Sequence, residues 1–250
     1  MKTIQKPWLK SLLLVMVVSG LMLAGCADSV NNSTQASAET NNTITAQASN
    51  PEMSTLPRLE GKATVVMTVK GSPITIEVDG ENAPITAGNF VDLVSRGVYD
   101  NLVFHRVVRD PQPFVVQGGD PQGKNPNVSV NQLGTGSFVD PDSGRPRYIP
   151  LEIKPQGADE PLYSKTFKQA RVSGAPVLNH TRGAVAMARS QMPDSASAQF
   201  YFALADLSFL DGDYAVFGYV TEGMDVVDGI QQGDRIDSAR VTAGAENLKR

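Results

Sequence analysis

Three polar side chains interrupt apolar segments of the sequence, and these side chains are the best placed to do chemistry. Arg106, Gln117 and Gln199 each lie in a segment rich in Phe and Val. Alternate residues of a strand share a face, so Val115 lies on the face of Gln117 and Tyr201 on the face of Gln199. An apolar floor with a few fixed hydrogen-bonding groups is typical of a ligand site. In the alternative interpretation Arg106 forms a surface ion pair and both glutamines face solvent.

The composition excludes several other chemistries. One Cys and two His residues, His105 and His180, are too few for a Cys-based or His-rich metal centre. No glycine-rich loop ends in Lys-Ser or Lys-Thr, as a phosphate-binding loop would. The 22 Lys and Arg residues against 26 Asp and Glu give a net charge of −4, which argues against a nucleic-acid partner. We therefore expect no metal, no other cofactor and no nucleic acid.

Residues 1–25 have the pattern of an export signal. Three lysines among the first ten residues precede an apolar stretch, 11–23, which is shorter than the about 20 residues of a membrane span. The stretch ends in Leu23-Ala24-Gly25-Cys26, which resembles the lipobox of bacterial lipoproteins. That resemblance implies lipid attachment at Cys26 and a membrane-anchored protein facing the periplasm, the cell exterior or a lumen-like compartment. The alternative is an ordinary signal peptide followed by a chance Cys.

A polar segment then separates this leader from one folded domain. Residues 26–60 are dominated by Asn, Ser, Thr, Ala and Gln, and they contain too few apolar residues to form a core. They predict a flexible tether behind the acylated Cys26. The domain is expected over residues 61–244, and residues 245–250 are expected to be a C-terminal tail.

Strand patterns outnumber helix patterns in this domain. Apolar residues 74, 76 and 78 alternate with polar ones, which predicts a half-buried strand joined by a hairpin to another strand over 63–69. Further strands are expected over 102–108, 114–118, 183–188, 199–204, 214–220 and 238–242, and helices over 86–96 and 223–231. Strands in a run with two isolated helices predict a mostly β fold, an antiparallel barrel closed so that no edge is exposed, with helices over its ends.

Ordered motifs across the domain resemble those of the cyclophilin-type peptidyl-prolyl cis-trans isomerases. The resemblance extends over about residues 63–241 and is carried by the segments 104–108, 114–120, 186–190, 194–202, 209–212, 214–218 and 222–227. It implies a closed eight-stranded antiparallel barrel capped by two helices. It also implies an enzyme without cofactor that rotates X-Pro bonds in polypeptide substrates.

The resemblance also implies roles for individual residues. Arg106 matches the catalytic arginine of the family. The positions that bind substrate are matched by Phe114, Val115, Gln117, Arg189, Gln199, Tyr201, Phe209, Leu210 and Tyr214. The segment Gly134-Thr135-Gly136 resembles a glycine-bearing loop beside the substrate groove. His105 lies on the opposite strand face from Arg106, and both His105 and His180 are interpreted as structural.

Two segments depart from the family pattern. The link Arg109–Pro113 is longer than usual and changes the spacing between Arg106 and Phe114. Residues 139–179 form a long insertion, which is expected to make surface loops and to offer a partner site. Within it, residues 148–153 resemble cyanobacterial and chloroplast-lumen cyclophilins.

Two functions remain open from the sequence. The first is an active prolyl isomerase that assists the folding of exported or membrane proteins. The second is a non-catalytic binding or assembly module that uses the same groove or the insertion. The intact Arg106, Gln117 and Gln199 favour the first. No sequence feature requires more than a monomer.

Overall fold

The computed structural model describes residues 53–250. The predicted export signal, Cys26 and the predicted tether up to residue 52 lie outside the described residues. Within residues 53–250, no helix is both long and apolar enough to cross a membrane.

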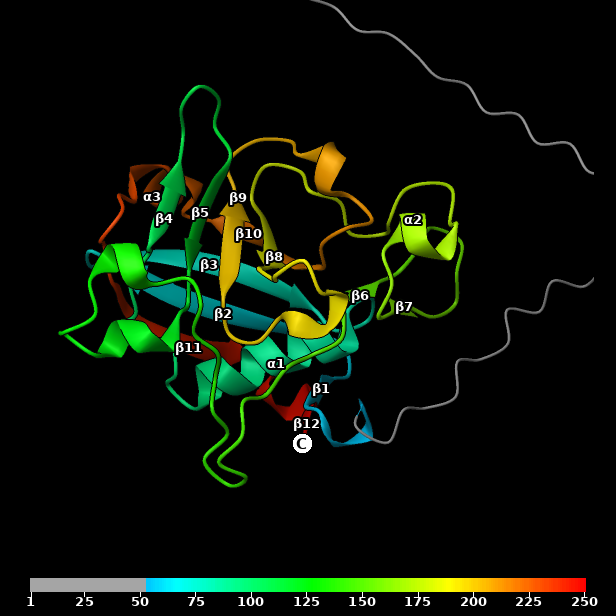
Figure 1. The fold of residues 1–250 in the computed structure, drawn as a ribbon, viewed down its shortest axis with the longest axis horizontal. Helices are drawn as coiled ribbons and strands as arrows, with labels where there is room; N and C mark the ends of the chain where they lie inside the picture. Colours follow the sequence, from blue (N-terminus) through cyan, green and yellow to red (C-terminus); the bar gives the residue numbers. More distant parts are fainter. Residues whose placement is uncertain (1–52) are drawn as a thin grey trace, which may run out of the picture. The chain divides into compact units, whose positions relative to one another are not determined.

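Eight antiparallel strands form one curled sheet in the order β11-β2-β3-β10-β8-β9-β5-β4 (Figure 1). The strands are β2 (Lys62–Val69), β3 (Ser72–Asp79), β4 (Arg106–Val108), β5 (Val115–Gly118), β8 (Ala184–Met187), β9 (Phe200–Ala203), β10 (Val216–Glu222) and β11 (Ile236–Ala243). Each predicted strand is present, although β4 is shorter than the expected 102–108. Residues 102–105 are apolar or buried without belonging to a strand, because burial alone does not require strand pairing.

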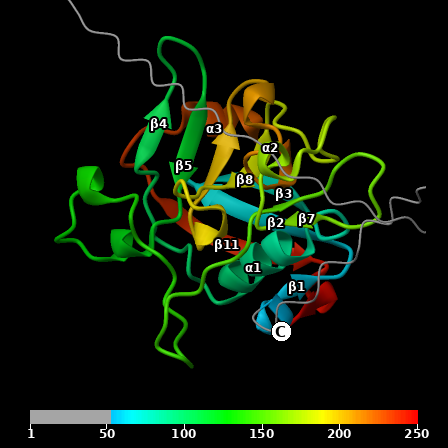
Figure 2. The same cartoon turned by 45° about the vertical axis from the view of Figure 1, so that its right-hand side comes forward.

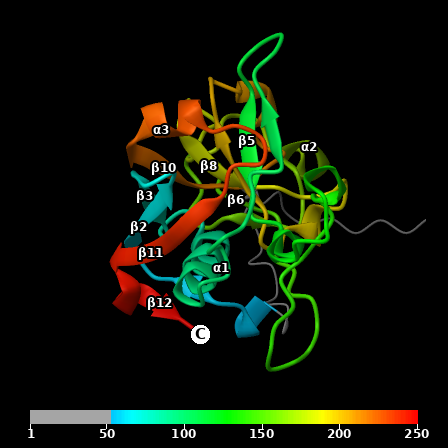
Figure 3. The same cartoon turned by 90° about the vertical axis from the view of Figure 1, so that its left-hand side faces the viewer.

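The sheet is not the closed barrel that the sequence analysis predicted. Within residues 53–250, the edge strands β4 and β11 do not pair with each other. The segments in front of them meet at an isolated bridge between Val103 and Arg235 and at nearby backbone bonds, such as Phe104 N–H to the Asp234 carbonyl at 2.8 Å. These contacts end at Phe104, before β4 begins at Arg106, so no ladder joins β4 to β11. The result is a curled antiparallel half-barrel (Figure 3).

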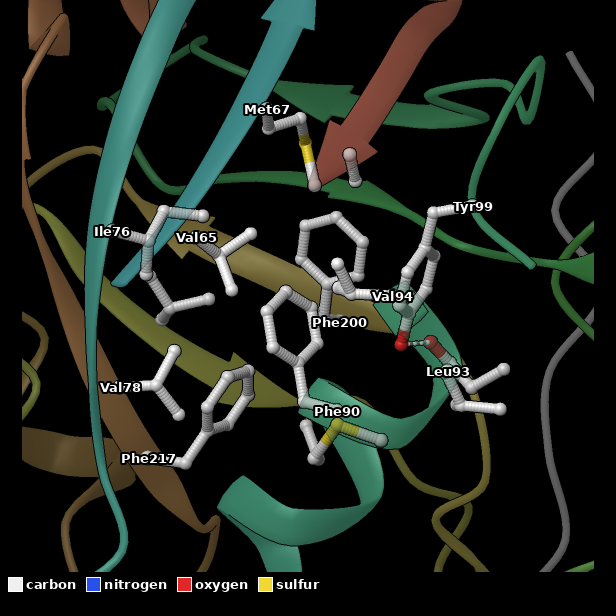
Figure 4. Packing of buried hydrophobic residues seen from close by; sticks show 14 of the residues in the cluster. Val65, Met67, Ile76, Val78, Phe90, Leu93, Val94, Tyr99, Phe200 and Phe217 are labelled. Atoms are coloured by element: carbon white, nitrogen blue, oxygen red, sulfur yellow. Dashed lines mark hydrogen bonds between the residues drawn. The ribbon is translucent and has the colours of Figure 1, made fainter. Parts of the chain in front are cut away.

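Helix α1 (Pro84–Ser95) supplies much of the core beneath this sheet. Phe90 lies among aromatic rings, with its ring centroid 4.8 Å from that of Phe217 and 5.5 Å from that of Phe200. Figure 4 shows Phe90, Leu93 and Val94 of the helix pointing toward side chains of the sheet. The apolar face predicted for this helix is buried, and so are the other residues of 85–94, including the polar Thr86, Asn89 and Asp92.

The other predicted helix is shorter than expected. α3 (Met224–Gly229) begins after Gly223, which has a positive φ of +84°. A Cβ at Gly223 would lie 2.4 Å from the Pro73 carbonyl oxygen, so both the backbone angle and the close approach to β3 require glycine.

Short elements complete the chain. They are β1 (Arg58–Leu59), β6 (Glu152–Ile153), β7 (Leu162–Tyr163), β12 (Leu248–Lys249), helix α2 (Phe167–Ala170), and the 3-10 helices η1 (Met53–Thr55), η2 (Pro121–Lys124), η3 (Val130–Gln132), η4 (Pro193–Ser195), η5 (Ser208–Leu210) and η6 (Ala245–Asn247). Figure 2 shows the loop that carries η2 and η3 extending away from the sheet.

The folded part extends beyond the boundaries expected at both ends. β1 lies in the segment expected to be tether, β12 lies in the expected tail, and the two strands pair with each other. Leu59 is fully buried in the main core, which explains why these residues are ordered with the domain. The side chain of Arg250 also donates to the buried Asp92 of α1 at 2.6 Å.

The insertion is fixed to α1 rather than forming only surface loops. Ala83, which precedes the helix, provides no side-chain cap. Instead, the buried carboxylate of Glu152 accepts hydrogen bonds from the backbone N–H groups of Ile85 and Thr86, at 3.1 and 2.7 Å. Arg147 donates to Asp92 of the same helix at 2.8 Å. The insertion therefore supplies the hydrogen-bond acceptor for the buried N–H groups at the start of the helix and a partner for the charge of Asp92.

Candidate active site

The three polar residues that the sequence singled out lie on β4, on β5 and directly before β9. Arg106 stands opposite Gln117 in one ladder, and Gln117 stands opposite Tyr201 in the next. Arg106 Nη1 lies 3.4 Å from Gln117 Oε1, and Gln117 Nε2 lies 3.3 Å from Gln199 Oε1. Gln199 Nε2 donates to the Gly136 carbonyl at 2.8 Å. A continuous polar row thus runs across the sheet from its β4 edge.

An aromatic cluster lies beside this polar row. We use this name for six residues that the sequence analysis assigned to substrate binding: Phe114, Val115, Tyr201, Phe209, Leu210 and Tyr214. Val115 and Tyr201 are buried members of one apolar group, and Phe114, Leu210 and Tyr214 pack against its margin. Phe209 stacks on Phe114 with ring centroids 6.1 Å apart, yet it remains 68% exposed. The cluster therefore has a buried floor and an exposed aromatic rim.

Arg106 connects the polar row to the aromatic cluster. Its side chain is exposed, and its guanidinium carbon lies 5.5 Å from the centroid of the Phe114 ring. In the part of the chain that the structure describes, Arg106 forms no salt bridge. The surface ion pair considered for this residue is therefore not formed. The charged guanidinium of Arg106 is therefore exposed at the edge of an apolar surface, with Gln117 as its hydrogen-bond partner.

The long link between Arg106 and Phe114 still lets the two side chains meet, 5.5 Å apart. Val107 and Val108 keep their ladder with β5, and the Phe114 N–H donates to the Val108 carbonyl at 3.0 Å. The additional residues leave the sheet as a projecting hairpin (Figure 1). Arg109 fastens that hairpin by donating to the carbonyls of Val227 and Asp228, at the end of α3, at 3.3 and 2.8 Å.

A groove of about 540 Å³ adjoins the polar row. Its lining includes Gln117, Arg189 and Gln199 together with the glycine-bearing loop 134–136. The backbone N–H groups of Gly134 and Gly136 donate to the buried Asp120 carboxylate at 2.6 and 3.0 Å. A Cβ at Gly136 would lie 2.0 Å from that carboxylate, so this close approach requires glycine.

The side chain of Arg189 binds the segment that contains Asp213 and Tyr214. Its guanidinium donates twice to the Asp213 carbonyl, at 2.6 and 3.0 Å, and lies 4.6 Å from the centroid of the Tyr214 ring. Arg189 therefore joins the groove to the aromatic cluster. Hydrogen bonds thus bring Arg106, Gln117 and Gln199 together, and ring contacts join Arg106 to Phe114 and Arg189 to Tyr214.

The two histidines occupy different environments. His105 directly precedes β4 and is buried, whereas the neighbouring Arg106 is exposed, and burial lowers the pKa of His105. His180 is 2% exposed and binds Asp211 and Tyr201. Sequence reasoning missed the link from His180 to the cluster, because its partners lie 31 and 21 residues away and leave no local pattern. Among residues 53–250, no group of three or more His, Cys, Asp or Glu side chains could hold a metal ion.

The chain resembles named proteins over the same domain. A Synechocystis sp. protein named as a thylakoid lumen peptidyl-prolyl cis-trans isomerase is 41% identical over 208 residues, which are 79% of this chain and 51% of that protein. The chloroplastic isomerase CYP38 of Arabidopsis thaliana is 38% identical over 215 residues, 79% of this chain and 46% of that protein. The chain thus spans about half the length of these two relatives.

Further comparisons cover more of the matched proteins. A Brucella abortus protein named as a peptidyl-prolyl cis-trans isomerase is 32% identical over 180 residues, 71% of this chain and 76% of that protein. The crystal structure of a Cryptosporidium parvum cyclophilin has the same fold, with a TM-score of 0.53 and 22% identity over 73% of this chain and 98% of that one. Residues 64–246 match the family described as "Cyclophilin type peptidyl-prolyl cis-trans isomerase/CLD". The chain therefore belongs to the cyclophilin-type peptidyl-prolyl cis-trans isomerase family.

Proposed function

We propose that this protein is an active peptidyl-prolyl cis-trans isomerase and that Arg106 is its catalytic residue. The observation that carries the proposal is the position of the Arg106 guanidinium. It is exposed, pairs with no carboxylate among the described residues, and borders the aromatic cluster. A proline ring placed on the cluster brings its amide within reach of this donor. Each copy of the chain carries the complete set of residues, so a monomer suffices.

The reaction requires rotation about an amide bond, with no covalent bond made or broken. Resonance sets a barrier of about 18–20 kcal/mol, and uncatalysed exchange takes about 10–100 s. In the planar amide the proline nitrogen shares its lone pair with the carbonyl. In the twisted transition state the lone pair is localised and accepts a hydrogen bond. A donor aimed at that nitrogen binds the transition state better than the ground state, and this difference lowers the barrier.

The neighbouring groups have separate tasks in this proposal. The aromatic cluster holds the proline ring. Gln117 accepts from Arg106 at 3.4 Å and so orients the guanidinium. Gln199 is fixed by the Gly136 carbonyl, and we assign its side chain and the main chain at Arg189 to the flanking peptide. Arginine suits the catalytic position because its charge persists at all working pH values and its donor fork is rigid.

An isomerisation assay on a short peptide containing Ala-Pro tests the activity. The expected result is acceleration of cis-trans exchange in proportion to enzyme concentration, measured by NMR exchange or by coupled proteolysis. Binding of the peptide without acceleration would instead support the non-catalytic module.

We also propose that the domain is anchored through lipid at Cys26 and acts on exported or membrane proteins in a lumen-like or periplasmic compartment. The lipobox-like segment at residues 23–26 and the thylakoid lumen and chloroplast names of the relatives support this proposal. Mass spectrometry of the membrane fraction should find the chain starting at a lipid-modified Cys26, and Cys26→Ser should abolish that form. A soluble wild type with an unmodified terminus elsewhere would exclude the anchor.

A further inference from the structure

We propose that His180 and Asp211 are positioning residues for the proline site and act through the hydroxyl of Tyr201. This inference rests on the proposed isomerase function. A chain of hydrogen bonds carries it: His180 Nδ1 lies 2.7 Å from Asp211 Oδ1, and His180 Nε2 lies 3.0 Å from the Tyr201 hydroxyl. Tyr201 belongs to the buried floor of the aromatic cluster.

The direction of the hydrogen bonds follows from the groups themselves. An ionised carboxylate only accepts, so the proton of the neutral imidazole lies on Nδ1 and is donated to Asp211. Nε2 then has a free lone pair and accepts the proton of the Tyr201 hydroxyl. Burial lowers the pKa of His180, which keeps the ring neutral at pH 7. Burial also raises the pKa of Tyr201, so its hydroxyl keeps the proton that it donates.

The hydrogen-bond chain joins the β9 part of the aromatic cluster to the η5 part. Tyr201 lies on β9, whereas Asp211 directly follows η5, which carries Phe209 and Leu210. The main chain of His180 strengthens this link, because its N–H donates to Asp211 at 2.9 Å and its carbonyl accepts from the Leu207 N–H at 2.7 Å. His180 therefore binds the residues on both sides of η5 and the floor residue Tyr201.

The ring contacts show what the hydroxyl contributes. The Tyr201 ring stacks on the His180 ring with centroids 6.1 Å apart, and it meets the Tyr214 ring edge-on at 6.2 Å. Phenylalanine at position 201 would keep the ring but lose the link to His180. The expected consequence is a looser cluster that binds proline less well, while Arg106 remains in place. Binding should therefore weaken more than the catalytic step.

Tyr201→Phe tests the link because it keeps the ring, and Tyr163→Phe is a matched control. Tyr163 also forms a hydrogen bond through its hydroxyl, with Glu152, but it lies in β7, away from the aromatic cluster and the groove. We expect Tyr201→Phe to raise KM for an Ala-Pro peptide by about 2- to 12-fold, the range that corresponds to one net hydrogen bond. The turnover number kcat should change by less than about 2-fold, and the control should change neither.

A double-mutant cycle and one spectrum complete the test. As a single change, His180→Gln should raise KM. In the double variant with Tyr201→Phe it should raise KM little further, because both substitutions remove the same hydrogen bond. The chain has only two histidines, so ¹⁵N NMR resolves His180, and the proton is expected on Nδ1. An unchanged KM in folded Tyr201→Phe, or a proton found on Nε2 of His180, would overturn the inference. An inactive wild type would instead contradict the proposed function, and the NMR tautomer would still test the chain of hydrogen bonds.

Discussion

Single residues of the site differ sharply in how far solvent reaches them. Tyr201 and Val115 are buried, while Arg106 and Phe209, which both contact Phe114, are exposed. Truncation of a buried member disturbs the packing of the fold, whereas exposed members can be removed with little effect on stability. The exposed residues therefore separate function from folding experimentally.

Phe209 provides such a separation. Phe209→Ala removes the exposed ring that stacks on Phe114, and we expect KM for a proline peptide to rise by about 2- to 12-fold, from the loss of about 0.5–1.5 kcal/mol of aromatic contact. Thermal unfolding should shift little, because the side chain is mostly exposed. Val139→Ala, another exposed apolar side chain, is the control. Equal KM values for both variants would show that Phe209 does not bind the substrate.

Secondary-structure elements reach this site through contacts that span long stretches of chain. Glu152, in the short strand β6, lies 67 and 66 residues from the N–H groups that it caps on α1. Arg109 fastens the hairpin after β4 to the end of α3, 118 and 119 residues away. The insertion and the long link are therefore part of the support of the domain.

The contact between β6 and α1 predicts an effect on stability. Glu152→Ala leaves the N–H groups of Ile85 and Thr86 without their acceptor in a buried place, and we expect a loss of about 1–3 kcal/mol in the free energy of unfolding. Urea unfolding measures this loss. Glu160→Ala, an exposed carboxylate of the same insertion, should leave stability unchanged. Equal stability of the two variants would show that Glu152 is not needed as a cap.

The elements themselves were largely predictable, because local patterns specify them. Alternation of Ile74, Ile76 and Val78 predicts β3, and these three residues are fully buried in the structure. Strand parity also places Arg106 away from His105. The apolar residues before Arg106 were wrongly included in a strand, because apolar composition reports burial and not ladder pairing.

The long-range part of the site could not be predicted from local patterns. The register that sets Arg106 opposite Gln117 depends on how the intervening link folds, and the link from His180 to Tyr201 and Asp211 depends on the whole sheet. The prediction of a closed barrel was also wrong. Closure requires β4 and β11 to pair with each other, and local sequence patterns do not specify that pairing.

At the scale of the whole molecule, one buried carboxylate joins three distant segments. Asp92 accepts hydrogen bonds from Arg96 on its own helix, from Arg147 in the insertion and from Arg250 at the C-terminus, at 2.6–2.8 Å. Burial alone would raise the pKa of Asp92, but the hydrogen bonds from Arg250 and Arg147 hold it below its ordinary value of 3.8. The folded protein therefore binds this proton less tightly than the unfolded chain.

Asp92 accordingly predicts acid sensitivity and a large mutational cost. The contribution of Asp92 to the free energy of unfolding is complete above a pH of about 4 and is lost as the pH falls below that value. Asp92→Asn leaves Arg147, whose side chain is only 10% exposed, without its carboxylate, and should lower the free energy of unfolding by about 3–5 kcal/mol at pH 7. Glu77→Gln breaks an exposed pair with Lys62 and should lower the free energy of unfolding far less, because solvent screens that pair. Similar costs for both variants, measured by urea unfolding, would contradict this account.

The central claim is that Arg106 catalyses isomerisation from an exposed position. The most direct measurement is kcat/KM for an Ala-Pro peptide in Arg106→Ala, together with thermal unfolding, with the exposed ion-pair residue Arg240 changed to Ala as the control. Loss of a charge-assisted hydrogen bond of about 1.5–3 kcal/mol predicts a decrease of about 10- to 150-fold. Arg106→Lys should also be impaired, and all variants should unfold near the wild-type temperature. Full activity in Arg106→Ala would contradict the catalytic assignment, and unfolding of that variant would show that Arg106 is structural.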